Sequence, residues 1–438
     1  MWVRAPPSNA APRYQSTRRQ VSSRWGAFAV RNYRVYFLGN AITLSGYWLL
    51  RVAQSWLVLD LTNSPEALGT LQVVQFLPIT ILTLFAGVVL DRVPMRWLMV
   101  ATEVAVGLAA ALMAVLVLTH TVAFWQLLVL GALIGVASAF DQPARTAFAN
   151  ELVGPGRIGN AIAMNSSLNN GARIIGPGLG GVMIALWGTG VCFVVAAVSC
   201  LGAVGSLLAL NGHELYPKRM AARGAMLGQL KDGLLYSFST PTLAFQMIVM
   251  AFVGTFAFNW GLTLALLARF GLDSGSEGFG VLNMSLGIGA VAGGVVLASR
   301  LVPSVRLVLV SASAYAVLVF LIGLAPNMPV AVLVVAVTGA MSLAYSASAS
   351  TLIQLEADDR YRGRVMGLFM LLWSGTTPLG SWFTGWLADR WDIRAAMQVD
   401  GTLSLLGVLV SAVYLVLARR RRGRPVVLST SDSARQPT

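Results

Sequence analysis

Long apolar runs separated by short polar segments follow one another along almost the whole chain. Each run has about 20 residues or more, the length that an α-helix needs to cross the hydrocarbon core of a bilayer. The pattern therefore predicts an all-α membrane protein with twelve transmembrane helices. We place them at about residues 35–59, 67–90, 97–118, 124–146, 160–185, 189–210, 243–268, 277–298, 305–324, 329–350, 365–388 and 396–418.

One polar segment, at about residues 211–242, is longer than all the other breaks between apolar runs. It lies between the sixth and seventh runs, so we predict two six-helix bundles joined by a middle loop. The predicted parts are a cytoplasmic basic tail at 1–34, an N-terminal bundle at 35–210, a cytoplasmic middle loop at 211–242, a C-terminal bundle at 243–418 and a second cytoplasmic basic tail at 419–438.

Two short sequences recur at matching places in the two predicted bundles. GVVL ends the second run at 87–90 and the eighth run at 294–297. Charged segments with a glycine before the next helix follow the fourth and tenth runs, at 150–160 and 354–364. The chain is therefore interpreted as an internal duplication, the parallel repeat found in a large class of transporters.

The lysine and arginine residues are concentrated on one side of the predicted membrane. Most of the 31 lie in the two tails, the middle loop and the connections on the same side as these. Cytoplasmic loops carry such an excess, so both termini are expected in the cytoplasm. This topology, with attraction to anionic membrane lipids, accounts for the net charge of +14. Nucleic acid, the usual partner of so basic a soluble protein, is not expected.

The composition excludes several other classes of protein. Only 11% of the residues are charged, against about a quarter in soluble domains. Cys192 and Cys200 lie about 12 Å apart along one predicted helix, too far for a disulfide. The two histidines are isolated, so neither a metal site nor a cofactor is expected. Lys218 and Lys231 follow no glycine-rich loop, so an ATP-driven pump is disfavoured and no enzymatic activity is expected.

Several stretches carry a resemblance to a known family. GVVLDRVPMR at 87–96 resembles the loop 2–3 signature of the major facilitator superfamily, with Pro94 and Met95 where that signature has a glycine and a basic residue. GARIIGPGLGG at 171–181 resembles the antiporter motif of that superfamily. The drug and siderophore exporter branch, which includes enterobactin exporters, is similar over about 30–418. The stretches that carry this narrower likeness are FDQPARTAF at 140–148, NAIAMNSSLNNGARIIGPGLGG at 160–181 and RGRVMGLFMLLWSGTTPLGS at 362–381.

The resemblance implies the major facilitator fold, with two pseudo-symmetric bundles that rock about a central cavity. It implies a secondary transporter of the cell membrane that exports amphipathic small molecules, drug-like or siderophore-like, by alternating access and proton antiport. Its partners would be the substrate, protons and membrane lipids, and it would be a monomer. Two alternatives stay open: a proton- or ion-coupled symporter importing an anionic metabolite, and a non-transporting membrane receptor or scaffold.

A first group of candidate residues concerns gating and proton coupling. Asp91 ends the second run and is replaced by Ala298 in the second copy; it can cap the facing helix near residues 362–365. The alternative is an ordinary loop charge. The gating candidates are Gly87, Asp91, Arg92, Arg96, Asp141 and Arg145.

Asp141 and Arg145 are four residues apart on one helix face, which favours an ion pair; a proton carrier is the alternative for Asp141. Glu103, in the inner third of the third helix, is costly there unless paired or neutral. It either titrates with Asp141 as a proton-coupling residue or reaches to the interface. Asp400 lies near the start of the last run, so exposure to solvent is expected.

A second group concerns packing between the two halves. Small residues in the fifth and eighth helices allow two helices to approach closely. We predict that these two helices pack across the bundles; ordinary packing within one bundle is the alternative. The residues are Gly176, Pro177, Gly180, Gly181, Gly289 and Gly293.

A third group concerns the substrate cavity. Polar stripes facing lipid would be costly, so they are expected to line a cavity, or else to join helices by hydrogen bonds. The candidates are Asn40, Tyr47, Arg51, Gln54, Gln72, Gln75, Asn165, Asn169, Arg173 and Asn259.

Arg51 and Arg173 lie near the predicted membrane middle, with no carboxylate at their level. We hypothesise a positively charged cavity that favours anionic or catechol-bearing substrates. In the alternative, both arginines only hold helices together.

Overall fold

The computed structural model describes residues 26–216, 226–300 and 303–421, and all regular structure in these ranges is helical. Most of the two predicted tails and residues 217–225 of the predicted middle loop lie outside them. The helices of the first half are α1 (Arg31–Thr62), α2 (Pro65–Arg92), α3 (Met95–Leu118), α4 (Phe124–Val153) and α5 (Ile158–Leu208). Those of the second half are α6 (Met226–Ser239), α7 (Pro241–Phe256), α8 (Trp260–Leu266), the π-helical η4 (Leu267–Gly271), α9 (Ser276–Arg300), α10 (Val305–Ile322), α11 (Met328–Glu356), α12 (Asp359–Gly375), α13 (Thr377–Arg390) and α14 (Ile393–Arg421).

Local chemistry sets several of these boundaries. Ser64 accepts a hydrogen bond from the amide of Ala67, and Pro65 occupies the first turn of α2. Asn327 caps α11 in the same way, by accepting from Val330. These side chains satisfy amides that have no partner inside the helix.

The spans differ from the predicted ones in three places. The predicted fifth and sixth spans form one element, α5, which turns at Gly188 with φ of 78°, a conformation that favours glycine. The predicted seventh span is divided into α7 and α8, and the eleventh into α12 and α13. In the described ranges, nine helical segments are long and apolar enough to cross a membrane. The count of twelve remains a prediction.

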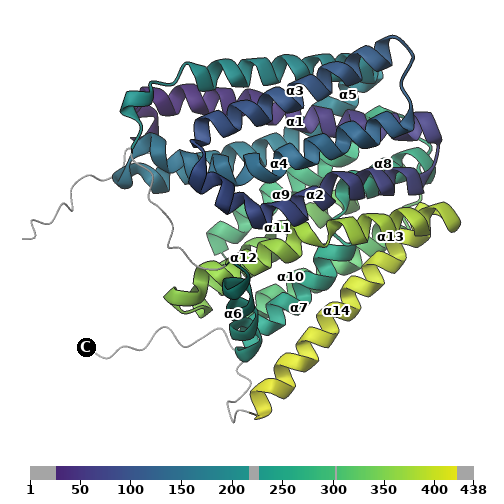
Figure 1. Cartoon of the computed structure of the whole chain (residues 1–438). Coiled ribbons are helices and arrows are strands. Elements are labelled where there is room, and N and C mark those ends of the chain that lie inside the picture. The colour runs from purple at the N-terminus through teal and green to yellow at the C-terminus, as the bar shows by residue number, and fades with distance from the viewer. Residues whose placement is uncertain (1–25, 217–225, 301–302, 422–438) are drawn as a thin grey trace, which may run out of the picture.

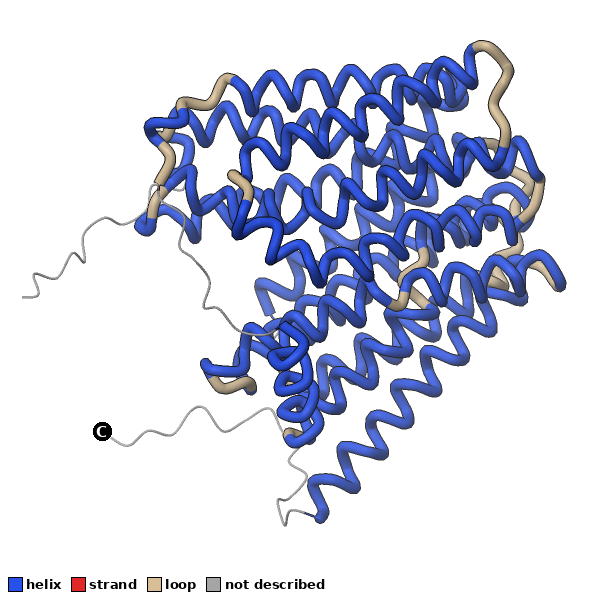
Figure 2. The backbone as a smooth tube through the Cα atoms, in the orientation of Figure 1, coloured by secondary structure: helices blue, strands red, loops and turns tan. Residues whose placement is uncertain are grey.

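The helices form two bundles, α1–α5 and α7–α14, which spread apart toward one side (Figure 1). We call that side the terminal face: α1 begins there and α14 ends there. The opposite side, where α1 ends and α14 begins, is the far face. The tube drawing shows the same divergence, with the helices nearly parallel within each bundle (Figure 2).

The distribution of the core agrees with this shape. A buried apolar cluster near the far face includes Leu59 and Leu68 of the first bundle and Leu266, Phe279 and Leu387 of the second. Two other clusters each stay within one bundle. Burial of apolar surface therefore joins the bundles at the far face, while each bundle has its own core elsewhere.

Candidate functional site

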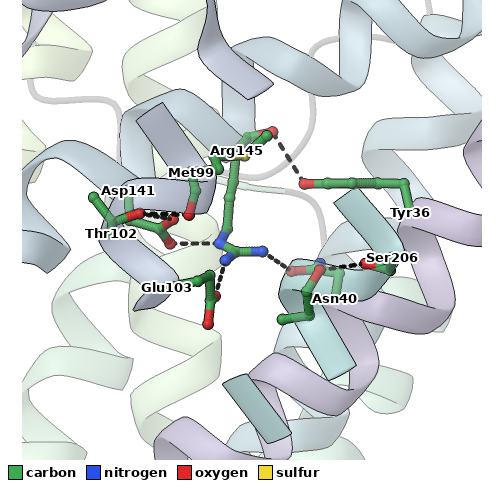
Figure 3. Close-up of polar contacts among 9 residues, drawn as sticks. Tyr36, Asn40, Met99, Thr102, Glu103, Asp141, Arg145 and Ser206 are labelled. Atoms are coloured by element: carbon green, nitrogen blue, oxygen red, sulfur yellow. Dashed lines mark hydrogen bonds and ion pairs between the residues drawn. The ribbon is translucent and has the colours of Figure 1, made fainter. Parts of the chain in front are cut away.

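A buried ionic cluster joins three helices of the first bundle (Figure 3). The guanidinium group of Arg145, on α4, forms ion pairs with Asp141 one turn earlier and with Glu103 of α3. It also donates a hydrogen bond of 3.1 Å to Asn40 of α1. Thr102 donates to the second oxygen of Asp141 at 3.0 Å. We call Asn40, Thr102, Glu103, Asp141 and Arg145 the Arg145 cluster.

The charges of the Arg145 cluster do not balance. Two carboxyl groups share one guanidinium, and only 5% of the Glu103 side chain is exposed. One carboxyl oxygen of Glu103, Oε2, is buried and has no hydrogen-bond partner. A buried ion that lacks a counter-ion is costly, so the cluster is best compensated when one of its carboxyl groups is neutral.

The Arg145 cluster bears on two of the alternatives left by the sequence. Glu103 is buried in the bundle, which favours pairing over a reach to the membrane interface. Asn40 joins α1 to α4 by a hydrogen bond, which favours the helix-joining alternative, and its place in the substrate cavity stays a prediction. Thr102 was missed, because an isolated threonine in an apolar run gives no signal of its partner.

A second polar group surrounds Arg51 in the same bundle, nearer the far face than the Arg145 cluster. The guanidinium group of Arg51 donates to the hydroxyl of Tyr47 at 2.9 Å and to the side-chain oxygen of Gln75 at 3.2 Å. It also lies over the ring of Phe76, 4.3 Å from the centroid. Gln75 in turn donates to Gln54 at 2.9 Å.

Gln54, Gln72 and Gln75 are all buried. Their predicted place in the lining of a substrate cavity stays a prediction. For Gln54 and Gln75 the helix-joining alternative is favoured, since they join α1 to α2 by a hydrogen bond inside the bundle. Asn259 is also buried, between α7 and α8, and accepts a hydrogen bond from Ser381 at 3.2 Å.

Arg173 of α5 is more exposed than Arg51 when the whole residue is considered, but its guanidinium is enclosed by protein atoms and lies near Tyr47 and Arg51. Its guanidinium lies 6.0 Å from the ring centroid of Trp48, on α1. Among the described residues no ion pair or hydrogen bond of this guanidinium is found. Asn169, one turn earlier, is exposed as well and donates to the carbonyl of Asn165 at 2.8 Å.

The glycines of α5 pack on two different partners. A Cβ atom on Gly181 would lie 2.5 Å from the Cα of Gly280, so α5 and α9 are in backbone contact across the two bundles. Gly176 and Gly180 instead face Trp48 and Val52 of α1. The assignment of Gly180 to the contact between bundles is therefore wrong.

The glycine pair of the eighth predicted span is also reassigned. Gly289 and Gly293 face Ala336 and Ala340 of α11, within the second bundle. The spacing of the glycines shows that one face of the helix has small residues. It does not show which neighbouring helix packs on that face.

Two of the gating candidates, Asp91 and Arg92, lie at the terminal end of α2 and are exposed. Arg96 donates to the carbonyl of Leu208 at 2.8 Å, within its own bundle. In the second bundle, Arg362 pairs with Asp359 of its own helix at 2.7 Å.

At the far face, polar contacts cross between the bundles at two places. Arg269 pairs with Asp60 at 2.9 Å and also donates to Asn63 at 3.4 Å. Ser64 donates to Asp389 at 2.9 Å. The sequence analysis missed these contacts, although each member lies at the end of an apolar run. They mark the rim of the closed far face.

Asp400 corrects the sequence-based expectation of exposure. None of its surface is exposed, and within residues 26–216, 226–300 and 303–421 it accepts one hydrogen bond, of 2.8 Å, from Thr384 of α13. The depth of Asp400 along α14 was estimated correctly as near one end. Its neighbours on α13 could not be inferred from that depth.

Comparisons with known proteins agree with this architecture. Residues 22–422 match the family described as transmembrane secretion effector. The multidrug efflux pump Tap of Mycolicibacterium fortuitum is 28% identical over 87% of this chain and 93% of its own length. The staphyloferrin A transporter of Staphylococcus aureus is 23% identical over 88% of this chain and 96% of its own.

A solved structure shows the same fold at low sequence identity. The crystal structure of a bacterial homologue of the human lysosomal transporter Spinster, inward-facing and unoccupied, has a TM-score of 0.67 at 14% identity, over 94% of this chain and 100% of its own. The fold and the family match agree, and the chain belongs to the transmembrane secretion effector family of the major facilitator superfamily of transporters.

Proposed function

We propose that the protein exports amphipathic small molecules across the cell membrane in exchange for protons. The observation that carries the proposal is the Arg145 cluster, in which the buried carboxyl group of Glu103 and the partly buried one of Asp141 share one arginine. Such a site can take up one proton without leaving a buried charge unpaired. The proposal is supported by the relatives that are named as an efflux pump and as a siderophore transporter.

Alternating access gives the cluster its role. In the proposal the terminal face is cytoplasmic, because the basic segments lie on that side. The ribbons of the two bundles spread apart there and meet at the far face (Figure 1), which supports a proposed state that is open to the cytoplasm. In this state a proton carried by Glu103 or Asp141 leaves toward the cytoplasm, and the substrate enters the space between the bundles.

Glu103→Gln tests the coupling. The amide keeps the size of the side chain but cannot release a proton. We expect substrate exchange between two equal pools to continue in proteoliposomes, while accumulation driven by a pH gradient is lost. One exchanged proton can sustain about a tenfold ratio of substrate concentrations across the membrane for each pH unit of the gradient. The Glu103→Gln protein should lose this ratio.

The matched control is Glu66→Gln, an exposed glutamate in the first turn of α2. It should retain gradient-driven transport. A Glu103→Gln protein that accumulates substrate as the unchanged protein does would contradict the coupling.

Measurements on de-energised cells decide the direction of transport. Cells with an exporter then accumulate more substrate, whereas cells with an importing symporter accumulate less.

The two arginines define the substrate class that we propose, which is anionic. Arg51 already has three partners, whereas the guanidinium of Arg173 lies near Trp48, Tyr47 and Arg51 and has no ion pair or hydrogen bond within the described residues. Arg173→Gln should therefore weaken binding of an acidic dye such as calcein by about 10- to 100-fold, the value of one hydrogen bond to a charged group. Arg51→Gln should have a smaller effect of the same sign.

Equilibrium binding to purified protein measures both losses. Arg390→Gln is the matched control, because this arginine also lies over an aromatic ring, 4.9 Å from the centroid of Trp386, but at the far face. An equal loss for acidic and neutral dyes, or a selective loss for a cationic dye such as ethidium, would contradict the anionic class.

A further inference from the structure

Asp400 is a buried acid that the proposed exchange does not use. It lies in α14 and has no exposed surface. Its oxygen Oδ2 accepts a hydrogen bond of 2.8 Å from Thr384, whereas Oδ1 is buried without a partner. Ser404, one turn further along α14, is also fully buried, and its hydroxyl has no partner.

The surroundings of Asp400 supply no counter-ion in the part of the chain that the structure describes. Helices α7 and α8, which pack on α14, contain no charged residue. Tyr315 of α10 donates its hydroxyl to the carbonyl of Ala257. The other titratable or charged groups of α14 and of the elements packed on it lie toward helix ends or in η4: Arg269, Arg306, Asp389, Arg390, Asp392, Arg394, Tyr414, Arg419, Arg420 and Arg421.

Two of these arginines already have partners other than Asp400. Arg394, on α14 itself, donates to the carbonyls of Ala325 and Gly271. Arg269 of η4 pairs with Asp60 of the first bundle. An ionised Asp400 would therefore be an unpaired charge within a membrane span, which is costly. The neutral acid is the form that this site accommodates.

The partner of Asp400 lies on the helix that closes the far face. Thr384 belongs to α13, and residues on either side of it contact α2 of the first bundle. A Cβ atom on Gly69 would lie 2.8 Å from the carbonyl oxygen of Ser381 and 3.3 Å from the Cα of Gly385. The hydrogen bond between Thr384 and Asp400 therefore holds α14 against α13, at the point where α13 meets the first bundle.

We propose that Asp400 is a second proton-binding site, distinct from the Arg145 cluster, and that its protonation is required to close the far face. When the far face opens, α13 leaves α2 and water reaches the carboxyl group, which ionises by releasing its proton to water. Closure removes that water, so the carboxylate must first take up a proton. The closed state then binds one more proton than the open state, and a rise in pH favours opening.

A distance measurement across the far face tests this inference without any transport assay. The purified full-length protein, in lipid nanodiscs, carries spin labels at Glu66→Cys and Trp391→Cys, which are exposed on opposite bundles. Double electron–electron resonance measures the distance between the two labels. The distances give the ratio of closed to open molecules at each pH between about pH 5 and pH 9. We expect the ratio to fall with rising pH, at most about tenfold per pH unit for one linked proton.

Asp400→Asn has the shape of the neutral acid but cannot ionise. It should remain closed over the whole pH range, whereas the matched control Asp273→Asn, an exposed far-face residue, should keep the pH dependence of the unchanged protein. An Asp400→Asn protein with the original pH dependence would overturn the inference.

Thr384→Val supplies a second test, which also decides the question if the asparagine variant does not insert into the membrane. Loss of the hydroxyl removes the hydrogen bond that the neutral acid makes in the closed state, so the far face should open at lower pH than in the unchanged protein. A midpoint that does not move would count against the site. The inference fails or stands separately from the proposed exchange, which depends on Glu103 and is measured by gradient-driven transport.

Discussion

Arg145→Gln is expected to lower the free energy of unfolding by about 3–5 kcal/mol and to abolish gradient-driven transport. The change leaves Glu103 and Asp141 buried side by side without their cation. Removing one partner of a buried ion pair is far more damaging than the pair is stabilising, because the remaining charge has lost both water and its counter-ion. Thermal unfolding of the purified protein in one detergent measures the loss of stability.

Two comparisons separate the charge effect from simple loss of packing. The triple variant Arg145→Gln, Glu103→Gln, Asp141→Asn has no uncompensated charge and should recover most of the lost stability. Arg364→Gln breaks an ion pair with Asp232 that is more exposed, so it should cost less than about 1 kcal/mol. If Arg145→Gln unfolded at the same temperature as the unchanged protein, the cluster would not be a compensated buried network.

Gly181→Leu is expected to prevent closure of the far face and thereby to eliminate transport. A Cβ atom at this position would lie 2.5 Å from the Cα and 2.6 Å from the amide nitrogen of Gly280. Both neighbours are backbone atoms of α9, which cannot move aside as a side chain can. The variant should therefore stay open at the far face, and the two spin labels described above would report a larger separation.

The surroundings of the other glycines provide graded controls. Gly178 faces the flexible side chain of Met284, so Gly178→Leu should impair transport less than Gly181→Leu. Gly205 has no atom within 4 Å of an added Cβ, so Gly205→Leu should transport normally. Transport by Gly181→Leu at the level of the Gly205 control would show that the α5–α9 contact is not needed for closure.

The contacts across the far face differ in how easily they break. The Asp60–Arg269 pair is partly exposed, with 43% and 32% of the side chains accessible. Exposed ion pairs contribute about 0–1 kcal/mol, so the rim can open in each transport cycle at little cost. Beneath the rim, Trp56 stacks on Phe279 with ring centroids 6.2 Å apart. This apolar contact, the backbone contact of Gly181 with Gly280 and the close approach of α2 and α13 at Gly69 and Gly385 all contribute to the closure.

Sequence reasoning succeeded where the information was local. The spacing of Asp141 and Arg145 placed both on one helix face, and the structure shows them paired. It failed where a second helix had to be identified. Gln54 and Gln75 formed polar stripes as expected, yet they bond to each other inside the bundle. A stripe shows which face is polar but does not show whether that face meets water or another helix.

The sequence by itself determined the class of the protein, because the length of apolar runs, the internal repeat and the distribution of arginine are properties of the chain that no packing alters. Only the tertiary structure decided which residues act together. The rotation of each helix and its neighbours depend on contacts between distant positions, such as Arg145 with Asn40 and Gly181 with Gly280. Asp400 illustrates the difference: its depth follows from counting along α14, whereas its burial against Thr384 follows from the packing of α13 on α14.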